Sequence, residues 1–441
     1  MACSVAYGAL TLQYPSQKVI CTEKVKADKP HLEHLYSIPV VIFLKAVILA
    51  AGEGRRCRPL TQTRSKVLLP VGNRPFMEHV VRALAANNIR DLVVVVGYQK
   101  ERIMDYFEDG LDHGVNIRYV EQGETLGTAH ALSKAKPYLD GTFLAVNGDN
   151  LIDARSIGEL ISTEGDDVIL AALRRHTGYY GVLTVNQGVV ERIVEKPGRP
   201  CAGILNTGAY KFSLDIFDEI PRTPISERES YELTQTLSQM IDDGKKVRAT
   251  ITDGAWADAI FAWDLISANS LALNSLEPKV LGEVEDGARI RGPVEIGEGS
   301  IVRSGSYIVG PVSIGRNCDL GPNITVLPST SLGDSVRVGP NSEVRNSVVM
   351  NGTRIGSGSI ISDSILGASC LLRDQVVVES GPAVIDIEEE LHRAEFGAIL
   401  ADNVIVGSRA MAHPGTVIGT DSKAGSGTSL EGWIERGSRV V

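Results

Sequence analysis

A repeat of six residues dominates the last third of the chain. One aliphatic residue recurs at every sixth position through eleven consecutive repeats, and glycine follows many of these residues. These positions are Val284, Ile290, Ile296, Val302, Ile308, Ile314, Leu320, Val326, Leu332, Val338 and Val344. Such a hexapeptide repeat predicts a parallel β-helix, in which each short strand turns its aliphatic residue inward and successive coils stack on one another.

The repeat continues towards the C-terminus with two changes of register. It slips by one residue and resumes at Val349, Ile355 and Ile361, and slips again to Leu366, Leu372 and Val378. We expect it to return at Ile399, Ile405, Met411 and Val417. Between these two runs, the acidic segment 381–396 interrupts the pattern, and we expect it to loop out or to form a short helix.

The first two thirds of the chain alternate between apolar runs and amphipathic segments. Residues 45–51 and 91–97 predict buried strands, and residues 76–89 place apolar side chains on one face of a helix. Further strands are expected at 141–147 and 168–173, and a helix at 101–107. This alternation predicts an α/β, Rossmann-like domain with a parallel sheet, whose ligands bind beyond the carboxyl ends of the strands.

Four segments follow from these patterns. Residues 1–40 are expected to be a poorly ordered extension, because they contain no strong strand and no secretory signal pattern. The α/β domain is expected at 41–272, a linker at 273–282 and the β-helix at 283–441, with the insertion at 381–396.

Composition narrows the functional classes. Of the 441 residues, 43% are hydrophobic and 22% are charged, as in a soluble globular protein, and the net charge of −10 argues against a broad nucleic-acid or anionic-lipid surface. No apolar run approaches the roughly 18–20 residues that span a bilayer. The six cysteines form no C-x-x-C pair, which favours a reducing, cytoplasmic location.

A glycine-rich turn follows the first strand. The segment Leu49-Ala-Ala-Gly-Glu-Gly-Arg-Arg-Cys-Arg-Pro-Leu-Thr61 precedes Ser65-Lys66 and Leu69-Pro-Val71, and its glycines, Gly52 and Gly54, leave room for backbone N–H groups to close on an anion. It is not a P-loop, because no Gly-Lys-Ser/Thr closes it, and Cys57 stands where a dinucleotide fingerprint needs its third glycine. A triphosphate is the expected anion.

This segment resembles the signature of the sugar-1-phosphate nucleotidylyltransferase family, L-A-A-G-x-G-x-R-x-x-P-L-T followed by P/S-K-x-L-x-P-V. The resemblance covers about residues 44–270. With the hexapeptide tail, the chain is similar to archaeal-type bifunctional nucleotidylyltransferase/acetyltransferases that end in a left-handed β-helix. It implies transfer of a nucleotidyl group from UTP or dTTP to N-acetylglucosamine 1-phosphate or glucose 1-phosphate, with release of pyrophosphate.

The resemblance also implies roles for individual residues. Arg56 and Lys66 would be catalytic, since their positive charge would bind the reacting phosphates. Gln122 would face the edge of a pyrimidine, and His130 is interpreted as a core or helix-surface histidine rather than a functional one. The implied nucleotide-binding residues are Leu49, Ala51, Gly52, Gly54, Gln122, Gly127 and Thr128.

Two carboxylates and three short stretches complete the implied site. Asp149, in Asn-Gly-Asp after a strand, and Asp258, in Trp-Ala-Asp-Ala, would bind Mg²⁺, which prefers oxygen ligands. The family commonly has Asp-Val-Gly where this chain has Asp258-Ala-Ile-Phe, which weakens that assignment. The implied sugar-phosphate-binding residues are Gly181, Glu195, Lys196 and Asn206.

The β-helix departs from the acetyltransferase pattern of the bifunctional relatives. Their segment P-H-x-x-Y-x-G-D-S is replaced here, so that Ser357 stands in place of the basic histidine and Ile360 in place of the tyrosine. Serine cannot act as a base near neutral pH, so N-acetylation of glucosamine 1-phosphate by a bifunctional enzyme is the less favoured alternative, and acetyl-CoA is a disfavoured partner. His392 and His413 remain possible substitutes but are interpreted as surface residues. We expect the β-helix to be a platform for homotrimer assembly.

Two other functions stay open. A non-catalytic assembly or regulatory subunit could have the same pair of domains, although Arg56, Lys66, Asp149 and Glu195 are retained here. A guanylyltransferase for mannose 1-phosphate would share the architecture, but Gln122 and the segment 126–130 resemble the pyrimidine-selective branches more closely.

Overall fold

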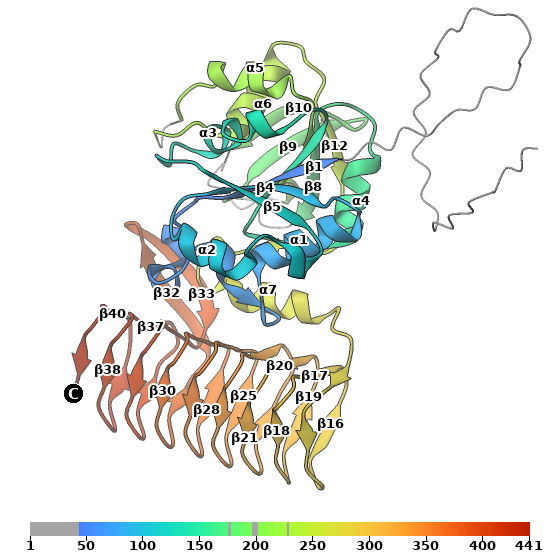
Figure 1. Cartoon of the computed structure of the whole chain (residues 1–441). Coiled ribbons are helices and arrows are strands. Elements are labelled where there is room, and N and C mark those ends of the chain that lie inside the picture. The colour runs from blue at the N-terminus through green and yellow to red at the C-terminus, as the bar shows by residue number, and fades with distance from the viewer. Residues whose placement is uncertain (1–43, 175–177, 196–201, 227–228) are drawn as a thin grey trace, which may run out of the picture. The chain divides into compact units, whose positions relative to one another are not determined.

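The computed structural model describes residues 44–174, 178–195, 202–226 and 229–441 (Figure 1). The extension expected at 1–40 and the predicted sugar-phosphate residue Lys196 therefore lie outside the described residues. Residues 44–441 belong to one structural unit, in which an α/β region is followed by a β-helix. None of the helices in the described ranges combines the length and the apolar character needed to cross a bilayer.

A nine-stranded sheet forms the α/β region, in the order β5-β4-β1-β6-β11-β8-β12-β10-β9. The strands expected from the sequence all run in the same direction, but β11 lies between β6 and β8 and is antiparallel to both. The sheet is therefore mixed rather than parallel. The bounds are β1 Lys45–Ala50, β4 Asp91–Val96, β5 Asn116–Glu121, β6 Phe143–Asn147, β8 Val168–Arg174, β9 Gly181–Asn186, β10 Val189–Glu195, β11 Gly203–Phe212 and β12 Arg248–Ile251.

Helices cover both faces of this sheet, which explains the continuous apolar runs of its strands. Alternate residues of β1 belong to two separate cores: Ile48 packs with α1, α2 and α4, whereas Val47 packs with α3, α5 and α6. Packing on both faces of the sheet therefore holds the carboxyl end of β1 in place. The helices are α1 Phe76–Ala86, α2 Lys100–Phe107, α3 Thr128–Ser133, α4 Ala154–Ser162, α5 Ile216–Glu219, α6 Leu233–Asp242 and α7 Asp264–Leu273.

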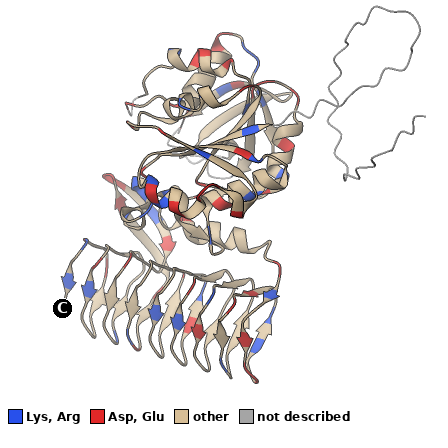
Figure 2. Ribbon diagram, viewed as in Figure 1, with Lys and Arg blue, Asp and Glu red and all other residues tan. Residues whose placement is uncertain are grey.

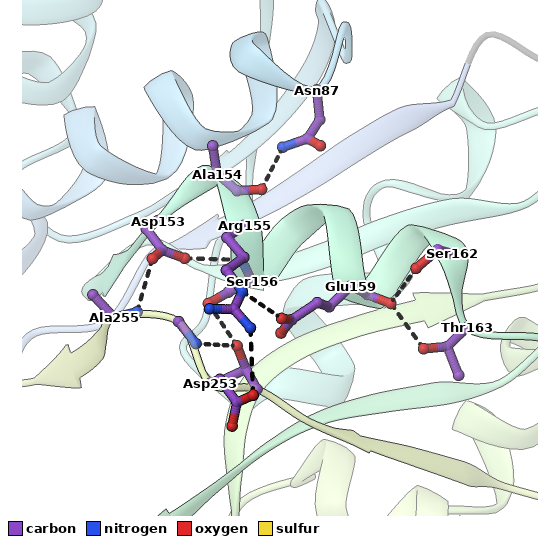
Figure 3. A network of polar contacts seen from close by, with 12 residues as sticks. Asn87, Asp153, Ala154, Arg155, Ser156, Glu159, Ser162, Thr163, Asp253 and Ala255 are labelled. Carbon is purple, nitrogen blue, oxygen red and sulfur yellow. Dashed lines mark hydrogen bonds and ion pairs between the residues drawn. The ribbon is translucent and has the colours of Figure 1, made fainter. Parts of the chain in front are cut away.

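A capping network positions the strand that ends in Asp258 (Figure 3). Asp153 is the N-cap of α4 and accepts hydrogen bonds from the backbone N–H of Ser156 and of Ala255, both at 2.8 Å. Ala255 leads into β13 (Trp256–Asp258), which is antiparallel to β7 (Asn150–Ile152) and pairs Asp258 with Asn150. Asp258 therefore lies beside the residue that follows Asp149.

Three parallel sheets build a left-handed β-helix, as the repeat and the resemblance predicted. They run from β14 (Lys279–Val280) to β40 (Trp433–Ile434), from β15 (Glu283–Val284) to β41 (Arg439–Val440), and from β16 (Arg289–Arg291) to β39 (Ser429–Leu430). Most of the aliphatic residues at the six-residue positions are fully buried in one continuous core. The first strand of the stack already begins at Lys279, within the segment expected to be a linker.

The register predicted for the last coils is wrong by one residue. Leu400, Val406, Ala412 and Ile418 point into the β-helix core, not the expected Ile399, Ile405, Met411 and Val417. Each inward residue directly follows an expected one, and both members of each pair are apolar, so the period alone could not choose between them. Ile399 and Val417 are buried as well, because they pack in the separate cluster formed with residues of the α/β region.

The acidic insertion is a β-hairpin rather than a loop or a short helix. Its strands are β32 (Gly381–Ile387) and β33 (Glu390–Phe396), joined by the two-residue turn Glu388-Glu389. Ile385 and Phe396 are buried, so the hairpin has an apolar face that packs onto the α/β region. The burial of these apolar side chains stabilises a packed hairpin, although the acidic composition of the segment indicates an exposed loop.

Candidate active site

The glycine-rich turn folds back on Lys66. Gly54 has a left-handed φ of 65°, and a Cβ on it would lie 2.7 Å from the Cβ of Lys66, so only glycine fits there. The hydroxyl of Thr61 donates to the Gly54 carbonyl at 3.0 Å and holds the turn. Nothing lies within 4 Å of the space that a Cβ on Gly52 would occupy. The turn is therefore closed towards Lys66 and open above Gly52.

The predicted nucleotide-binding residues line one cavity of about 680 Å³. It lies at the carboxyl ends of β1 and β6, the side of the sheet at which the sequence analysis predicted ligand binding. Among its lining residues are Leu49, Ala51, Gly52, Gly54, Lys66, Gln122, Gly127, Thr128 and Asp149. The structure therefore brings together residues that are up to 100 positions apart in the chain (49 to 149).

Lys66 and Asp149 line this cavity and form an ion pair, and Asp258 lines the adjoining cavity. Lys66 Nζ lies 2.5 Å from Asp149 Oδ2, and both side chains are mostly buried. Burial disfavours the charge of Lys66, but Asp149 and Asp258 outweigh it and raise the pKa of Lys66 above its usual range. Burial raises the pKa of Asp258, against the opposing effect of Lys66. Tyr180 donates a hydrogen bond of 2.6 Å to Asp258.

Within the described ranges, no group of three or more His, Cys, Asp and Glu side chains is arranged to hold a metal ion. The two carboxylates near Lys66 still fit a hard cation that takes its remaining ligands from substrate phosphates and water, because Mg²⁺ usually binds protein through one or two carboxylates. Asp149 faces the cavity directly, whereas Asp258 lines the adjoining one.

Gln122, predicted to face a pyrimidine, makes a side-chain contact that the sequence analysis did not predict. Gln122 is 5% exposed and donates from Nε2 to the Gly127 carbonyl at 3.0 Å and to His130 Nδ1 at 3.2 Å. Burial lowers the pKa of His130, which favours the neutral ring that this bond requires. Gly127 has a φ of 104°, and a Cβ there would lie 2.4 Å from the Tyr231 carbonyl. His130, on α3, therefore contacts Gln122 through its side chain.

Arg56 lines a second cavity of about 350 Å³ that shares Gly54 and Lys66 with the first. Asp258 also lines it, so Arg56, Lys66 and the two carboxylates surround adjoining spaces. Arg56 Nε donates to Glu388 Oε2 of the hairpin at 3.3 Å. No local pattern could predict this partner, because Glu388 lies 332 positions away in the chain.

The residues predicted to bind the sugar phosphate make contacts with one another and with the protein interior. Gly181 pairs with Glu195 across β9 and β10, and a Cβ on Gly181 would lie 3.0 Å from Glu195 Oε2. Asn206 is 8% exposed, donates to the Tyr210 hydroxyl at 2.7 Å and accepts from the Gly208 N–H at 2.9 Å. These three residues come together, but the amide of Asn206 is engaged inside the protein.

The positions that replace the acetyltransferase residues do not form a basic centre. Ser357 donates its backbone N–H to Asp374, and Ile360 is exposed. His413 is partly exposed, with Nδ1 3.2 Å from Glu379 and Nε2 2.8 Å from the Ser429 hydroxyl. The expectation that His392 lies on the surface is wrong, because this side chain is 8% exposed between aromatic rings of the α/β region.

The β-helix also contacts the part of the signature segment that lies between Arg56 and Lys66. Arg64 and Thr63 both bond to the carboxylate of Asp402, Thr63 at 2.6 Å, and the Arg64–Asp402 ion pair is mostly buried. Asp402 also accepts from the backbone N–H of Ala368 at 2.8 Å. One carboxylate of the β-helix thus fixes the segment between Arg56 and Lys66.

Replacing Asp402 with alanine is expected to lower the free energy of unfolding by about 2–4 kcal/mol, because it leaves the Arg64 charge buried without its partner. Denaturant unfolding of the full chain measures this loss. Asp319, a half-exposed β-helix carboxylate paired with Arg303, offers a matched alanine control that should change stability by about 1 kcal/mol or less. Equal stability of the two variants would contradict the role of Asp402.

Comparison with known proteins agrees with this geometry. Residues 45–274 match the family described as Nucleotidyl transferase, and residues 308–434 match the GMPPB C-terminal domain. The chain belongs to the nucleotidyl transferase family and is an enzyme of the sugar-1-phosphate nucleotidyltransferase type.

Several relatives match most of its length. Bifunctional protein GlmU of Methanococcus maripaludis strain C7 is 37% identical over 407 residues, which is 90% of this chain and 97% of the relative. Bifunctional protein GlmU of Methanocaldococcus jannaschii is 32% identical over 404 residues, again 90% and 97%. Glucose-1-phosphate thymidylyltransferase of Streptomyces antibioticus is 32% identical over 383 residues, which is 85% and 92%.

Proposed function

We propose that this enzyme transfers a nucleotidyl group from UTP or dTTP to N-acetylglucosamine 1-phosphate or glucose 1-phosphate, with Mg²⁺, and releases pyrophosphate. The observation that carries this proposal is Lys66, which is paired with Asp149 in a glycine-lined cavity and lines the adjoining cavity together with Asp258. The names of the relatives, GlmU and glucose-1-phosphate thymidylyltransferase, support a sugar 1-phosphate as acceptor.

The nucleotide would lie along the cavity from the base wall to the turn. Gln122, oriented by His130, would bond the edge of a pyrimidine, and Gly127 and Thr128 would line the wall beside the ring. The open space above Gly52 would admit the phosphates, with backbone N–H groups as donors. Leu49, Ala51 and Gly54 shape the same wall.

Asp149 and Asp258 would hold Mg²⁺, which when bound would neutralise charge on the reacting phosphates. Arg56 and Lys66 would contact the same phosphates from the adjoining cavity and from the floor. Gly181, Glu195, Lys196 and Asn206 would bind the sugar phosphate, with Asn206 acting through Tyr210 and Gly208 unless the sugar displaces these bonds.

In this site, an oxygen of the sugar phosphate attacks the α-phosphorus in line, a new P–O bond forms, and the bond to pyrophosphate breaks. The protein contributes position and electrostatics rather than a covalent intermediate. Lys66 is suited to this because its ammonium group lies 2.5 Å from Asp149 in the cavity, where it can contact a phosphate oxygen.

The β-helix would assemble the enzyme as a cytoplasmic homotrimer. Its flat, parallel sheets and its lack of a basic centre at Ser357 support a structural role over acetyl transfer. Light scattering of the full chain measures the mass, and a monomer would contradict the trimer.

Turnover is tested with the purified full chain, Mg²⁺, each nucleoside triphosphate and a panel of sugar 1-phosphates. We expect pyrophosphate release with UTP or dTTP and at least one of the two named sugar phosphates. Release only with GTP and mannose 1-phosphate would reassign the substrate, and no release with any pair would support a non-catalytic subunit.

A further inference from the structure

A carboxylate of the β-helix lies against one of the two cations assigned to phosphate binding. Glu388 Oε2 accepts from Arg56 Nε at 3.3 Å, and the side chains are 46% and 33% exposed. Both residues line the 350 Å³ cavity together with Lys66 and Asp258. The ion pair therefore lies inside the reaction site, where solvent and a nucleotide could both reach it.

The hairpin that carries Glu388 is fixed along its length. His392 accepts or donates a 2.9 Å hydrogen bond with the Tyr179 hydroxyl and packs 4.5 Å from the ring of Phe261. At the base of the hairpin, Phe396 stacks on Trp263 with ring centroids 5.7 Å apart. Phe261 and Trp263 follow Asp258 in the chain, so the hairpin is docked on the segment that bears a predicted metal ligand.

The tip of the hairpin concentrates negative charge (Figure 2). Glu388, Glu389 and Glu390 are consecutive and exposed, and both turn residues have left-handed φ values of 55° and 68°. Two-residue turns with both φ values positive normally use Asn-Gly, because longer side chains are strained there. Glutamates in this turn are conformationally unfavourable, which indicates that their charge has a use at this place.

We propose that Glu388 is an intramolecular competitor of the triphosphate for Arg56, so that the hairpin β32–β33 gates entry of the nucleotide. The proposal rests on the proposed function, because it takes Arg56 as a phosphate-binding residue. A carboxylate and a phosphate oxygen make the same charge-assisted hydrogen bond to a guanidinium group. The acidic tip also repels an incoming polyphosphate, so the nucleotide must displace Glu388 from Arg56 before it binds fully.

The proposed gate is formed by one residue of the β-helix and one residue of the α/β region. Glu388 enters the site from the β-helix, whereas Arg56 follows β1 of the α/β region. Any partner or ligand that shifts the hairpin would change the affinity for the nucleotide without touching the cavity itself. The expected kinetic signature is a change in KM for the nucleotide at constant kcat.

Equilibrium binding of inorganic pyrophosphate with Mg²⁺ to the full chain, measured by calorimetry, tests the gate without turnover. Glu388→Gln should tighten binding about three- to tenfold, the size expected when an exposed ion pair no longer competes. The matched control Glu389→Gln removes the same charge from a neighbour that has no ion pair among the described residues, and should change binding less than about twofold. Arg56→Gln should weaken binding, and adding Glu388→Gln to it should have no further effect.

The results of these binding measurements distinguish a failure of the proposed gate from a failure of the proposed phosphate site. If Arg56→Gln weakens binding but Glu388→Gln leaves it unchanged or weakens it, the gate is wrong and the phosphate site stands. Equal tightening by Glu388→Gln and Glu389→Gln would replace the specific contact with a general charge effect and also overturn the gate. If Arg56→Gln has no effect, both the gate and the assignment of Arg56 fail. Thermal unfolding of each variant verifies the fold.

Discussion

Turnover is expected to fall about a thousandfold when Lys66 is replaced by methionine. Methionine has a similar length but no charge, so the variant removes the ammonium group that lies 2.5 Å from Asp149 and leaves the phosphates without it. Steady-state release of pyrophosphate measures the loss. Because the pKa of Lys66 is raised, the wild-type rate should not depend on titration of this group near neutral pH.

Lys100→Met is the matched control. Lys100 lies on α2, pairs with Glu121 and lines neither cavity of the site, so its loss should leave turnover within about twofold. Thermal unfolding distinguishes lost chemistry from a lost fold, since Lys66→Met also leaves Asp149 without its cation. A folded Lys66→Met variant with more than about a tenth of the wild-type rate would remove Lys66 from the catalytic set.

Replacing Asp149 with asparagine is expected to reduce turnover about a hundredfold or more and to raise the Mg²⁺ concentration needed for half of the maximal rate. The neutral amide keeps the shape of the side chain but binds a divalent cation more weakly. Rates measured across a Mg²⁺ titration report both the loss of turnover and the change in the Mg²⁺ requirement. A changed Mg²⁺ requirement identifies Asp149 as a metal ligand, whereas an unchanged one indicates a residue that only pairs with Lys66.

Asp140→Asn provides the comparison for Asp149→Asn. Asp140 is an exposed carboxylate that also pairs with a lysine, Lys45, at 2.6 Å, but it lies away from the cavity. Its variant should keep the wild-type Mg²⁺ dependence. If Asp149→Asn shows that same unchanged dependence while losing rate, Asp149 positions Lys66 and does not bind the metal ion.

Patterns of local period and turn chemistry predicted most of the architecture. The six-residue repeat identified the β-helix because each inward position must be aliphatic whatever surrounds it. The signature segment after β1 predicted the cavity because its glycines leave room for backbone N–H groups to close on an anion. These features depend on neighbours in the sequence or on a strict repeat, so one sequence is enough to see them.

Features decided by long-range packing could not be predicted in the same way. The antiparallel β11 separates β6 from β8, and nothing local marks its direction. In the last coils, Ile399 and Leu400 are both apolar, and only contact with the α/β region decides which one points inward. The contact of Glu388 with Arg56 depends on where the hairpin docks, and its acidic composition indicated only a solvent-exposed insertion.

The bond from Asp402 to Arg64 and Thr63 has a consequence for how such chains can be recombined. The catalytic segment is completed by a residue that belongs to the repeat array, so the two halves are not independent modules. A chimera that joins residues 44–274 to the coils of another protein would inherit every catalytic side chain and still lose the support behind them. Transplanting residues 44–274 should therefore require an aspartate at the matching coil of the new β-helix.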